Sequence, residues 1–355
     1  MERQQKNLIV QTAFLGDTLL SLPLILYVRK IYPEQEIWYL CREGLGELLL
    51  HLKLVDKVIE VKKRKSDSYD QVIKDLKNEQ FENIFSPHES FRTSMLVKKL
   101  KAKRKIGFKK WWNSLIYTHR LSKPKHLPDA LRQLYLLYFL SPELNQFFSN
   151  KQGAQVFASQ NGMKTPQLPA WASMQREFEL RLPAGFIQSN KKRAVLAPGS
   201  QWVTKRWTPE GFLEVGKNLQ TQGFEILIVG SKDEKPICDK LAQKLIGAQN
   251  FCGQTSLIEL LSLLKKSDLL IVNDSGVMHM GAIAGLPTVA IYGPTTLDLG
   301  YRPWQSEARV VEKSLPCRPC GKHGHDKCPI GTHECMKSIA ASEVLSAVDS
   351  LSLKA

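Results

Sequence analysis

The stretch that most constrains the fold is NDSGVMHMGAIAGLPTVAIYGPT, residues 273–295. The apolar run DLLIVND overlaps its start, and the run PTVAIYG lies near its end. Both have the length and composition of strands buried on two faces, and the residues between them suit a short helix. A strand-helix-strand unit of this kind requires a parallel sheet. A polar site is therefore expected where the first strand ends, at Asp274 and Ser275.

The same alternation runs through both halves of the chain. In the first half, KNLIVQTA, EIWYLCRE and VDKVIEVKK are expected strands, and in the second half so are RAVLAPGS and FEILIVGS. Residues 159–192 contain three prolines and no sustained periodicity, which is typical of a linker. A chain of 355 residues also exceeds the usual size of one core. We predict α/β domains over residues 1–175 and 193–355, joined by a linker at 176–192.

The positive charge lies almost entirely in the first half. Residues 1–200 hold 33 Lys and Arg against 18 Asp and Glu, whereas residues 201–355 hold 17 against 16. A one-sided basic surface favours an anionic partner such as nucleic acid, an acidic membrane face or an anionic glycolipid. No apolar run approaches the roughly 20 residues needed to span a bilayer, and a long signal-peptide core is absent, so a cytoplasmic protein is expected.

Basic and aromatic residues alternate between Lys98 and Arg132, where Trp111, Trp112 and Tyr117 accompany a single acid, Asp129. Such a mixture suits a membrane headgroup layer. It equally suits a solvated basic face with packed tryptophans. No recognised nucleic-acid motif accompanies the charge, so a nucleic-acid partner is not expected.

Two loops are candidate phosphate sites. A helix that begins near Ser275 and Gly276 presents unpaired backbone N–H groups and the positive end of its dipole, and His279 lies one turn further on. The loop APGSQWVTKRWTPEGF brings Lys205 to the end of another strand. Either loop could instead be an ordinary capped loop. Neither has the pattern GxxxxGK[ST] or GxGxxG, which disfavours a kinase, an ATPase or a dehydrogenase.

Asp17 is the carboxylate that stands out in the first half. It lies in FLGD, at an expected strand-to-helix turn, where it could serve only to cap a helix that begins at residue 18. Beside a nucleotide diphosphate, a carboxylate could also remove a proton from an acceptor hydroxyl.

The residues FLGD with TLLSLPLI, PGS with TKRW and TPEGF, and the block 273–295 together resemble glycosyltransferase family 9, the ADP-heptose:lipopolysaccharide heptosyltransferases, and most of all the heptosyltransferase II branch. The resemblance extends from residue 8 to about residue 336. It implies a GT-B fold of two Rossmann-like, doubly wound domains that face a central cleft. The first domain would bind the acceptor and the second the donor, and the final helix could pack back on the first domain.

The resemblance also implies roles for single residues. Asp17 would be the general base of an inverting transfer of heptose from ADP-heptose to the lipopolysaccharide inner core, with no cofactor. The anionic lipid A-core acceptor would bring the enzyme to the cytoplasmic face of the inner membrane. The parts of the donor that these contacts would involve differ. The resemblance implies that the diphosphate is surrounded by Lys205, Ser200, Ser275, Gly276 and His279. It implies that the sugar or nucleoside is approached by Asp274 and Met278.

Four cysteines form the remaining cluster. Cys317, Cys320, Cys328 and Cys335 lie in a Gly- and Pro-rich segment, 317–335, that also contains three histidines. Four thiols so spaced could hold a structural zinc ion, and an iron finger in related heptosyltransferases makes iron an alternative. A reduced, thiol-rich loop without metal is the other interpretation.

Three other functions remain open at this stage. A family 9 enzyme could use another nucleotide sugar or a protein acceptor. A sugar-nucleotide epimerase of the same shape would need two acid/base groups, and the sequence offers one clear carboxylate. A nucleic-acid-binding protein would have to combine the basic stretch with the cysteine cluster, although these lie in different expected domains.

Overall fold

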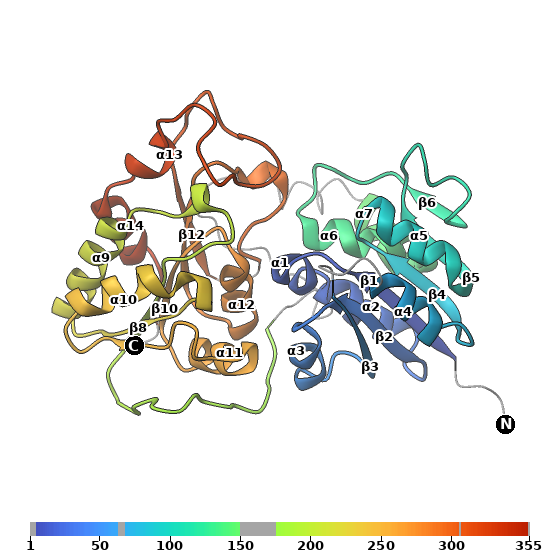
Figure 1. The fold of residues 1–355 in the computed structure, drawn as a ribbon, viewed down its shortest axis with the longest axis horizontal. Helices are drawn as coiled ribbons and strands as arrows, with labels where there is room; N and C mark the ends of the chain where they lie inside the picture. The colour runs from blue at the N-terminus through green and yellow to red at the C-terminus, as the bar shows by residue number, and fades with distance from the viewer. Residues whose placement is uncertain (1–4, 63–67, 150–174, 305–306, 354–355) are drawn as a thin grey trace. The chain divides into compact units, whose positions relative to one another are not determined.

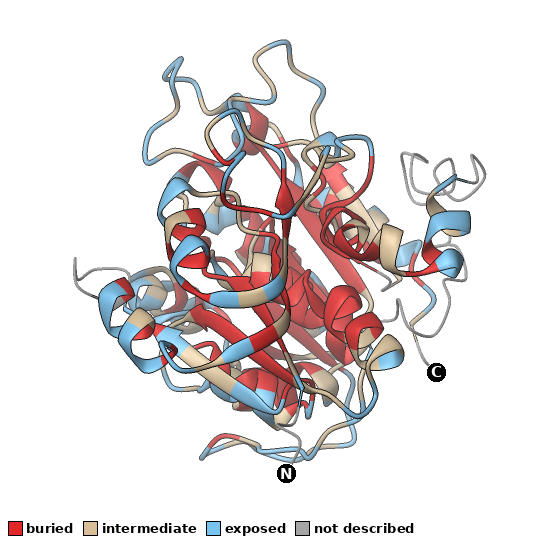
Figure 2. Cartoon of the chain, turned by 90° about the vertical axis from the view of Figure 1, so that its right-hand side faces the viewer, coloured by how far each residue is buried: buried red, intermediate tan, exposed pale blue. Residues whose placement is uncertain are grey.

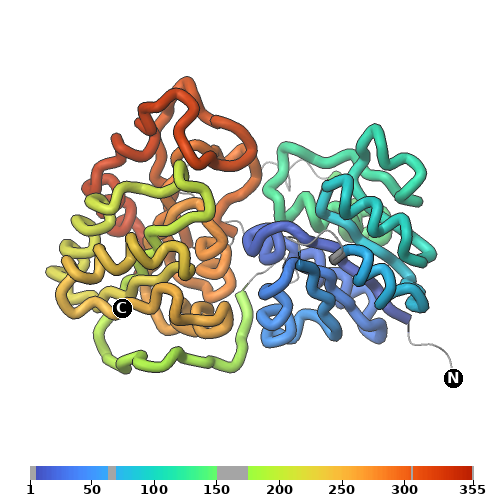
Figure 3. Tube along the Cα trace, in the orientation of Figure 1, coloured from blue at the N-terminus to red at the C-terminus, as the bar shows by residue number. Residues whose placement is uncertain are grey.

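The computed structural model describes residues 5–62, 68–149, 175–304 and 307–353. Contacts divide the chain into two compact units, which follow one another along the sequence (Figure 3). The described part of unit 1 ends at residue 149, and that of unit 2 begins at residue 175. Each unit contains one six-stranded, all-parallel sheet with helices on its faces (Figure 1).

Unit 1 has the strand order β3-β2-β1-β4-β5-β6. Its strands are β1 (Lys6–Gln11), β2 (Glu36–Arg42), β3 (Lys57–Val61), β4 (Gln80–Ser86), β5 (Lys101–Phe108) and β6 (His119–Leu121). Its helices are α1 (Leu15–Leu19), α2 (Leu22–Ile31), α3 (Gly46–His51), α4 (Ser68–Asp75), α5 (Phe91–Lys99), α6 (Asp129–Leu134), the 3₁₀ helix η1 (Tyr135–Leu140) and α7 (Pro142–Ser149).

Unit 2 has the order β12-β11-β10-β7-β8-β9. Its strands are β7 (Arg193–Ala197), β8 (Glu225–Ile228), β9 (Gln249–Asn250), β10 (Leu269–Asn273), β11 (Thr288–Tyr292) and β12 (Ala308–Glu312). Its helices are α9 (Pro209–Thr221), α10 (Lys235–Lys244), α11 (Leu257–Lys265), α12 (Gly276–Ala284), α13 (Glu334–Lys337) and α14 (Ala341–Asp349), with 3₁₀ turns η3 (Val203–Lys205), η4 (Lys232–Glu234) and η5 (Leu297–Leu299).

The central strands of both sheets are buried on both faces, as their continuous apolar runs predict (Figure 2). Local signals set the helix boundaries. In α9, Thr208 caps the first turn by accepting a hydrogen bond from the N–H of Gly211 at 3.2 Å, and Pro209 is the first helical residue. In α12, the helix ends at Gly285, whose φ of +69° is a left-handed conformation that glycine adopts without strain.

In each sheet the strand order reverses once, between β1 and β4 in unit 1 and between β7 and β10 in unit 2. In a doubly wound sheet, ligands bind outside the carboxyl ends of the strands at this reversal. The loops that follow β1 and β4, and those that follow β7 and β10, are therefore where each unit is expected to bind.

The ends of unit 2 refine the expected domain organisation. The described residues 175–192 contain no helix or strand, and the N–H of Arg181 donates to Ser262 Oγ at 2.9 Å, so this segment runs along unit 2. The final helix, α14, packs against α9, β11 and β12. Its apolar face, including Val344 and Val348, is buried in the core of unit 2.

Among the described residues, no helix is long and apolar enough to cross a bilayer.

Candidate functional site

Asp17 lies just beyond the carboxyl end of β1, as the third residue of α1. Its Oδ2 accepts a hydrogen bond from the N–H of Phe14 at 3.3 Å. The helix begins at Leu15 and not at residue 18, so Asp17 lies within the first turn and bonds back to the residue before it. The side chain keeps partial contact with solvent.

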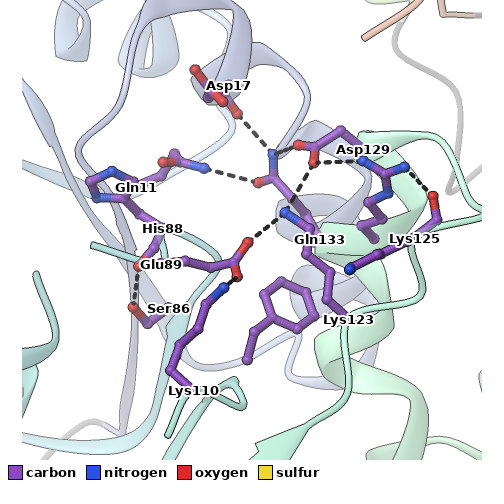
Figure 4. A network of polar contacts seen from close by, with 12 residues as sticks. Gln11, Asp17, Ser86, His88, Glu89, Lys110, Lys123, Lys125, Asp129 and Gln133 are labelled. Atoms are coloured by element: carbon purple, nitrogen blue, oxygen red, sulfur yellow. Dashed lines mark hydrogen bonds and ion pairs between the residues drawn. The ribbon is translucent and has the colours of Figure 1, made fainter. Parts of the chain in front are cut away.

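A second carboxylate, Asp129, lies in the same network as Asp17 (Figure 4). Gln133 connects the two residues, because its Nε2 donates to Asp129 Oδ2 at 2.8 Å and to the carbonyl oxygen of Asp17 at 3.1 Å. The Oε1 of Gln133 accepts from Gln11 at the end of β1, at 3.4 Å. Helix α6 is thereby tied to the β1–α1 turn.

Two lysines and a glutamate extend this network to the loop after β4. Lys123 lies 2.6 Å from Glu89 Oε1 and 3.5 Å from Asp129 Oδ1, and Lys110 lies 2.6 Å from Glu89 Oε2. Burial opposes the ionisation of Glu89, but the ammonium groups of Lys123 and Lys110 outweigh it and lower its pKa. The two ammonium groups thus hold Glu89 as a carboxylate, in contrast with Asp17.

The environment of Asp17 raises its pKa from 3.8 to about 6. The largest cause is burial, which penalises the charged form, and the next is the negative charge of Asp129. The N–H groups of Phe14 and of Asp17 itself and the more distant Lys123 act in the opposite direction. A carboxylate with such a pKa is ionised near neutral pH yet basic enough to accept a proton, as a general base requires.

Sequence reasoning found Asp17 but missed its partners. Asp129 had one available signal: it is the single acid in the basic stretch and precedes an apolar helical run. Glu89 and Gln133 carry no motif, and their proximity comes from the meeting of β4 and α6 at the carboxyl end of β1.

In unit 2, Lys205 and Asp274 form a buried ion pair of 2.5 Å. Lys205 ends the 3₁₀ turn after β7, and Asp274 follows β10, so the strand reversal brings the two predicted loops together. Thr295, in the loop after β11, donates to the same oxygen, Asp274 Oδ2, at 2.6 Å. Ser200 Oγ donates to the carbonyl oxygen of Asp274 at 3.4 Å.

Helix α12 begins at Gly276, directly after this ion pair. The residue before it, Ser275, makes no side-chain cap, and its buried Oγ has no hydrogen-bond partner among the described residues. An unsatisfied buried hydroxyl at a helix N-terminus is suited to an anion, together with the first N–H groups of the helix. His279 is buried in this helix.

Met278, which the resemblance places near the sugar or nucleoside of the donor, lies in the first turn of α12. Its side chain is fully buried, and its sulfur accepts a hydrogen bond from the hydroxyl of Tyr292 at 3.3 Å. Met278 therefore supports α12 against β11.

Asn273 and Trp207 hold the Lys205 loop in place. Asn273 Oδ1 accepts from the N–H of Trp207 at 3.0 Å, while its Nδ2 donates to the carbonyl oxygen of Pro198 at 2.9 Å. The buried indole of Trp207 donates through Nε1 to the carbonyl oxygen of Ile339 at 3.1 Å. Lys205 is thus fixed by β10 on one side and by the segment before α14 on the other.

The cysteine-rich segment 317–335 packs on the same loop. The N–H and the hydroxyl of Thr204 both donate to the carbonyl oxygen of His325, at 3.0 and 2.9 Å. His333 Nε2 lies 2.8 Å from the carbonyl oxygen of Thr204 and donates to it. The segment therefore supports the residue next to Lys205, a role that sequence reasoning did not foresee.

The four thiols of this segment are free, and no group of three or more His, Cys, Asp or Glu side chains in the described ranges is placed to hold a metal ion. Burial, and then the neighbouring Cys320, raises the pKa of Cys335 to about 11. Cys320 donates to the carbonyl oxygen of Cys317, and Cys328 accepts from the N–H of His333. Two of the four thiols thus bond to backbone groups, and the arrangement of the described side chains does not support the expected zinc or iron site.

The family profile decides the identity of the chain. The profile of glycosyltransferase family 9 (heptosyltransferase) matches residues 70–329. The chain belongs to glycosyltransferase family 9. The matched range includes Lys205 and the N-terminus of α12, and begins after Asp17.

Relatives of this family 9 protein carry heptosyltransferase names. It is 35% identical over 183 residues to the lipooligosaccharide heptosyltransferase 2 of Campylobacter jejuni, across 49% of this chain and 56% of the relative. The aligned part thus spans little more than half the length of that relative. It is 24% identical over 291 residues to the lipopolysaccharide core heptosyltransferase OpsX of Haemophilus influenzae, across 80% of this chain and 78% of the relative.

Solved structures share the fold of this family 9 protein. A family 9 glycosyl transferase from Veillonella parvula has a TM-score of 0.75 at 20% identity, covering 98% of this chain and 97% of that one. The E. coli ADP-heptose lipopolysaccharide heptosyltransferase II has a TM-score of 0.71 at 18% identity, covering 97% and 98%. The iron-containing dodecameric glycosyltransferase TibC of E. coli has a TM-score of 0.56 at 15% identity, covering 98% and 76%. The GT-B type of architecture is confirmed.

Proposed function

We propose that this protein is an inverting heptosyltransferase that moves heptose from ADP-L-glycero-D-manno-heptose to the inner core of lipopolysaccharide, in the manner of a heptosyltransferase II. Family membership and the names of the relatives support this substrate pair. The observation that carries the proposal is that the candidate base and the candidate anion site each lie at the strand reversal of a doubly wound sheet.

Asp17 is the proposed general base. It accepts the proton of the acceptor hydroxyl as that oxygen forms a bond to the anomeric carbon of the heptose. Its pKa of about 6 supports this role, because the carboxylate is ionised at neutral pH and still basic enough to accept a proton. Asp129 is proposed as a positioning residue: through Gln133 it fixes the turn that carries Asp17, and its charge opposes the ionisation of Asp17.

Lys205 and the N-terminus of α12 are the proposed site for the diphosphate of the donor. As the bond from the anomeric carbon to oxygen breaks, its electron pair stays on the β-phosphate of ADP. Lys205, the hydroxyls of Ser200 and Ser275, and the first N–H groups of α12, from Gly276 onward, stabilise that charge without a metal ion. His279 lies on the same helix, one turn in. Asp274 holds Lys205 in place and is proposed to lie near the sugar.

The acceptor in this proposal is an anionic lipid A-core molecule held in the cytoplasmic face of the inner membrane. The surplus of Lys and Arg in the first 200 residues supports an anionic acceptor and peripheral contact with the membrane. The transfer itself uses no cofactor, and the cysteine-rich segment enters only as a support of the Lys205 loop.

The direct test is incubation of the purified protein with ADP-heptose and heptose-deficient core acceptors, followed by mass spectrometry. We expect an acceptor heavier by one heptose and the release of ADP. Calorimetry with ADP and UDP tests the choice of nucleotide. An ADP-heptose sample converted to its epimer without acceptor would favour an epimerase, and transfer only from another nucleotide sugar would favour a different family 9 activity.

A further inference from the structure

Three large apolar side chains of unit 1 are left in solvent within one short region. Trp111 and Leu115 are each 90% exposed, and Phe91 is 60% exposed. Trp111 and Leu115 belong to the loop that joins β5 to β6, and Phe91 is the first residue of α5 (Figure 1). We call these three residues the apolar tip. Clustered exposed apolar surface marks an interaction site more often than scattered single residues do.

The loop that carries Trp111 and Leu115 is firmly held from inside. The buried Asn113 donates through Nδ2 to the carbonyl oxygen of Phe108 at 2.9 Å, and its Oδ1 accepts from the N–H of Lys110 at 3.0 Å. Two residues beyond Leu115, the buried Tyr117 shares hydrogen bonds of 3.0 Å with Ser86 and with Ser94. These hydrogen bonds fix the rest of the loop to the sheet, so the loop itself holds Trp111 and Leu115 in solvent.

An aromatic contact joins the loop to α5. The ring of Trp112 meets that of Phe91 edge to face, with centroids 5.3 Å apart. This contact packs Phe91 against the loop, in the edge-to-face geometry that aromatic pairs prefer.

Positive charge predominates around the apolar tip. Residues 90–128 contain no Asp or Glu, and Arg92, next to Phe91, and Lys109, two residues before Trp111, are exposed. Lys98 and Lys99, in the last turn of α5, are exposed as well. The acid that precedes this stretch, Glu89, is paired with Lys110 and Lys123. A surround of this sign is complementary to an anionic surface, and the exposed tryptophan favours a bilayer as that surface.

We propose that Trp111, Leu115 and Phe91 insert into the headgroup layer of an anionic lipid bilayer, with Arg92 and Lys109 against the lipid phosphates. Tryptophan settles at membrane interfaces, and Lys and Arg near an anionic leaflet are attracted to its phosphates. This inference deepens the proposed function, since an acceptor anchored in lipid has to be met at the bilayer surface. It assigns that contact to the loop between β5 and β6, which also carries Lys110 of the network around Asp17.

The test is sedimentation of the full chain with vesicles of phosphatidylcholine alone and of phosphatidylcholine mixed with phosphatidylglycerol. We expect binding to the mixed vesicles, a loss of binding with added NaCl, and a weakening of about tenfold or more in the double variant Trp111→Ser/Leu115→Ser. Ile246→Ser is the matched control, because Ile246 is also 90% exposed but lies in unit 2. That control should bind like the unchanged protein.

Two outcomes would overturn the docking surface: no binding of the unchanged protein to mixed vesicles, or equal binding by the double variant and the Ile246→Ser control. The second outcome would point to a protein partner for the tip. Thermal unfolding and ADP binding of the double variant should match the unchanged protein, which shows that it is folded. Transfer to a water-soluble, lipid-free acceptor separates the two proposals. If the unchanged protein binds vesicles but does not transfer heptose to this acceptor, the heptosyltransferase function is rejected and the docking surface is retained.

Discussion

Each unit presents a carboxylate at the strand reversal of its sheet, and the surroundings of the two carboxylates differ. In unit 2, Asp274 is bonded directly to Lys205 and Thr295 through one oxygen, and is buried with them. In unit 1, Asp17 faces a second carboxylate, Asp129, and the cation in its surroundings, Lys123, is paired with Glu89 and Asp129. The same residue type thus has a raised pKa in unit 1 and holds a lysine through an ion pair in unit 2. The role is set by the neighbours and not by the strand-loop-helix motif.

The largest predicted effect on this contrast between the units comes from removing the carboxylate of Asp17. Asp17→Asn should lower transfer by at least about a hundredfold, the scale expected for the loss of a general base. ADP binding, measured by calorimetry, should stay near that of the unchanged protein, because the proposed donor site lies on unit 2. An Asp17→Asn enzyme with full activity would show that Asp17 is only part of the α1 turn.

Removal of Lys205, the partner of Asp274 in unit 2, should affect ADP binding, which Asp17→Asn should leave unchanged. Lys205→Ala should weaken ADP binding about tenfold to a hundredfold, since a hydrogen bond to a charged group contributes about 1.5–3 kcal/mol, and should slow transfer as well. Lys235→Ala is the control, because Lys235 also pairs with a carboxylate, Asp239 at 2.9 Å, but on the exposed face of α10. Equal ADP affinity in the two variants would contradict the donor role of Lys205.

The stability of the protein should respond to Asp17 in the direction opposite to activity. A carboxyl whose pKa is raised from 3.8 to about 6 favours folding in its protonated form, so its stabilising contribution is full below pH 4 and lost as the pH rises through 6. Asp17→Asn stays neutral, so at pH 8 it should unfold at the same temperature as the unchanged protein or at a higher one. Its free energy of unfolding should exceed that of the unchanged protein by at most about 3 kcal/mol. The difference should vanish near pH 4. A lower melting temperature for Asp17→Asn at pH 8 would contradict the raised pKa.

The smallest predicted effect concerns Asp129 and the pH dependence of kcat/KM. Because the base must be ionised, kcat/KM should rise with pH through about 6. Asp129→Asn removes a charge that opposes ionisation of Asp17, so the rise should move to lower pH while remaining above 3.8, since burial is the larger cause. A merely structural Asp129 would change the height of the profile and leave its midpoint in place.

The sequence predicted the elements that local patterns determine. The runs around Leu8, Leu196 and Ile271 are strands because continuous apolar runs suit a parallel sheet buried on both faces, and Thr208 with Pro209 marks the start of α9. The tight Lys205–Asp274 pair was half predicted: both residues were found, but their contact depends on the adjacency of β7 and β10.

Other features depend on tertiary contacts that no local pattern carries. Asp129 is linked to Asp17 through Gln133, which also bonds to Gln11 at the end of β1. The spacing of the cysteines did not reveal that their segment packs on Thr204. The basic stretch likewise includes β5, whose lysines alternate along a strand, while Trp111 alone of its two tryptophans stands fully in solvent.

The indole of Trp207 makes the lysine of the donor loop sensitive to the tail of the protein. Its Nε1 bond reaches the carbonyl of Ile339, 132 residues further along the chain, just ahead of α14. A deletion that reaches Ile339 would remove this hydrogen bond and with it one support of the loop that carries Lys205. Such a truncation would then lower activity although every residue of the proposed site is still present.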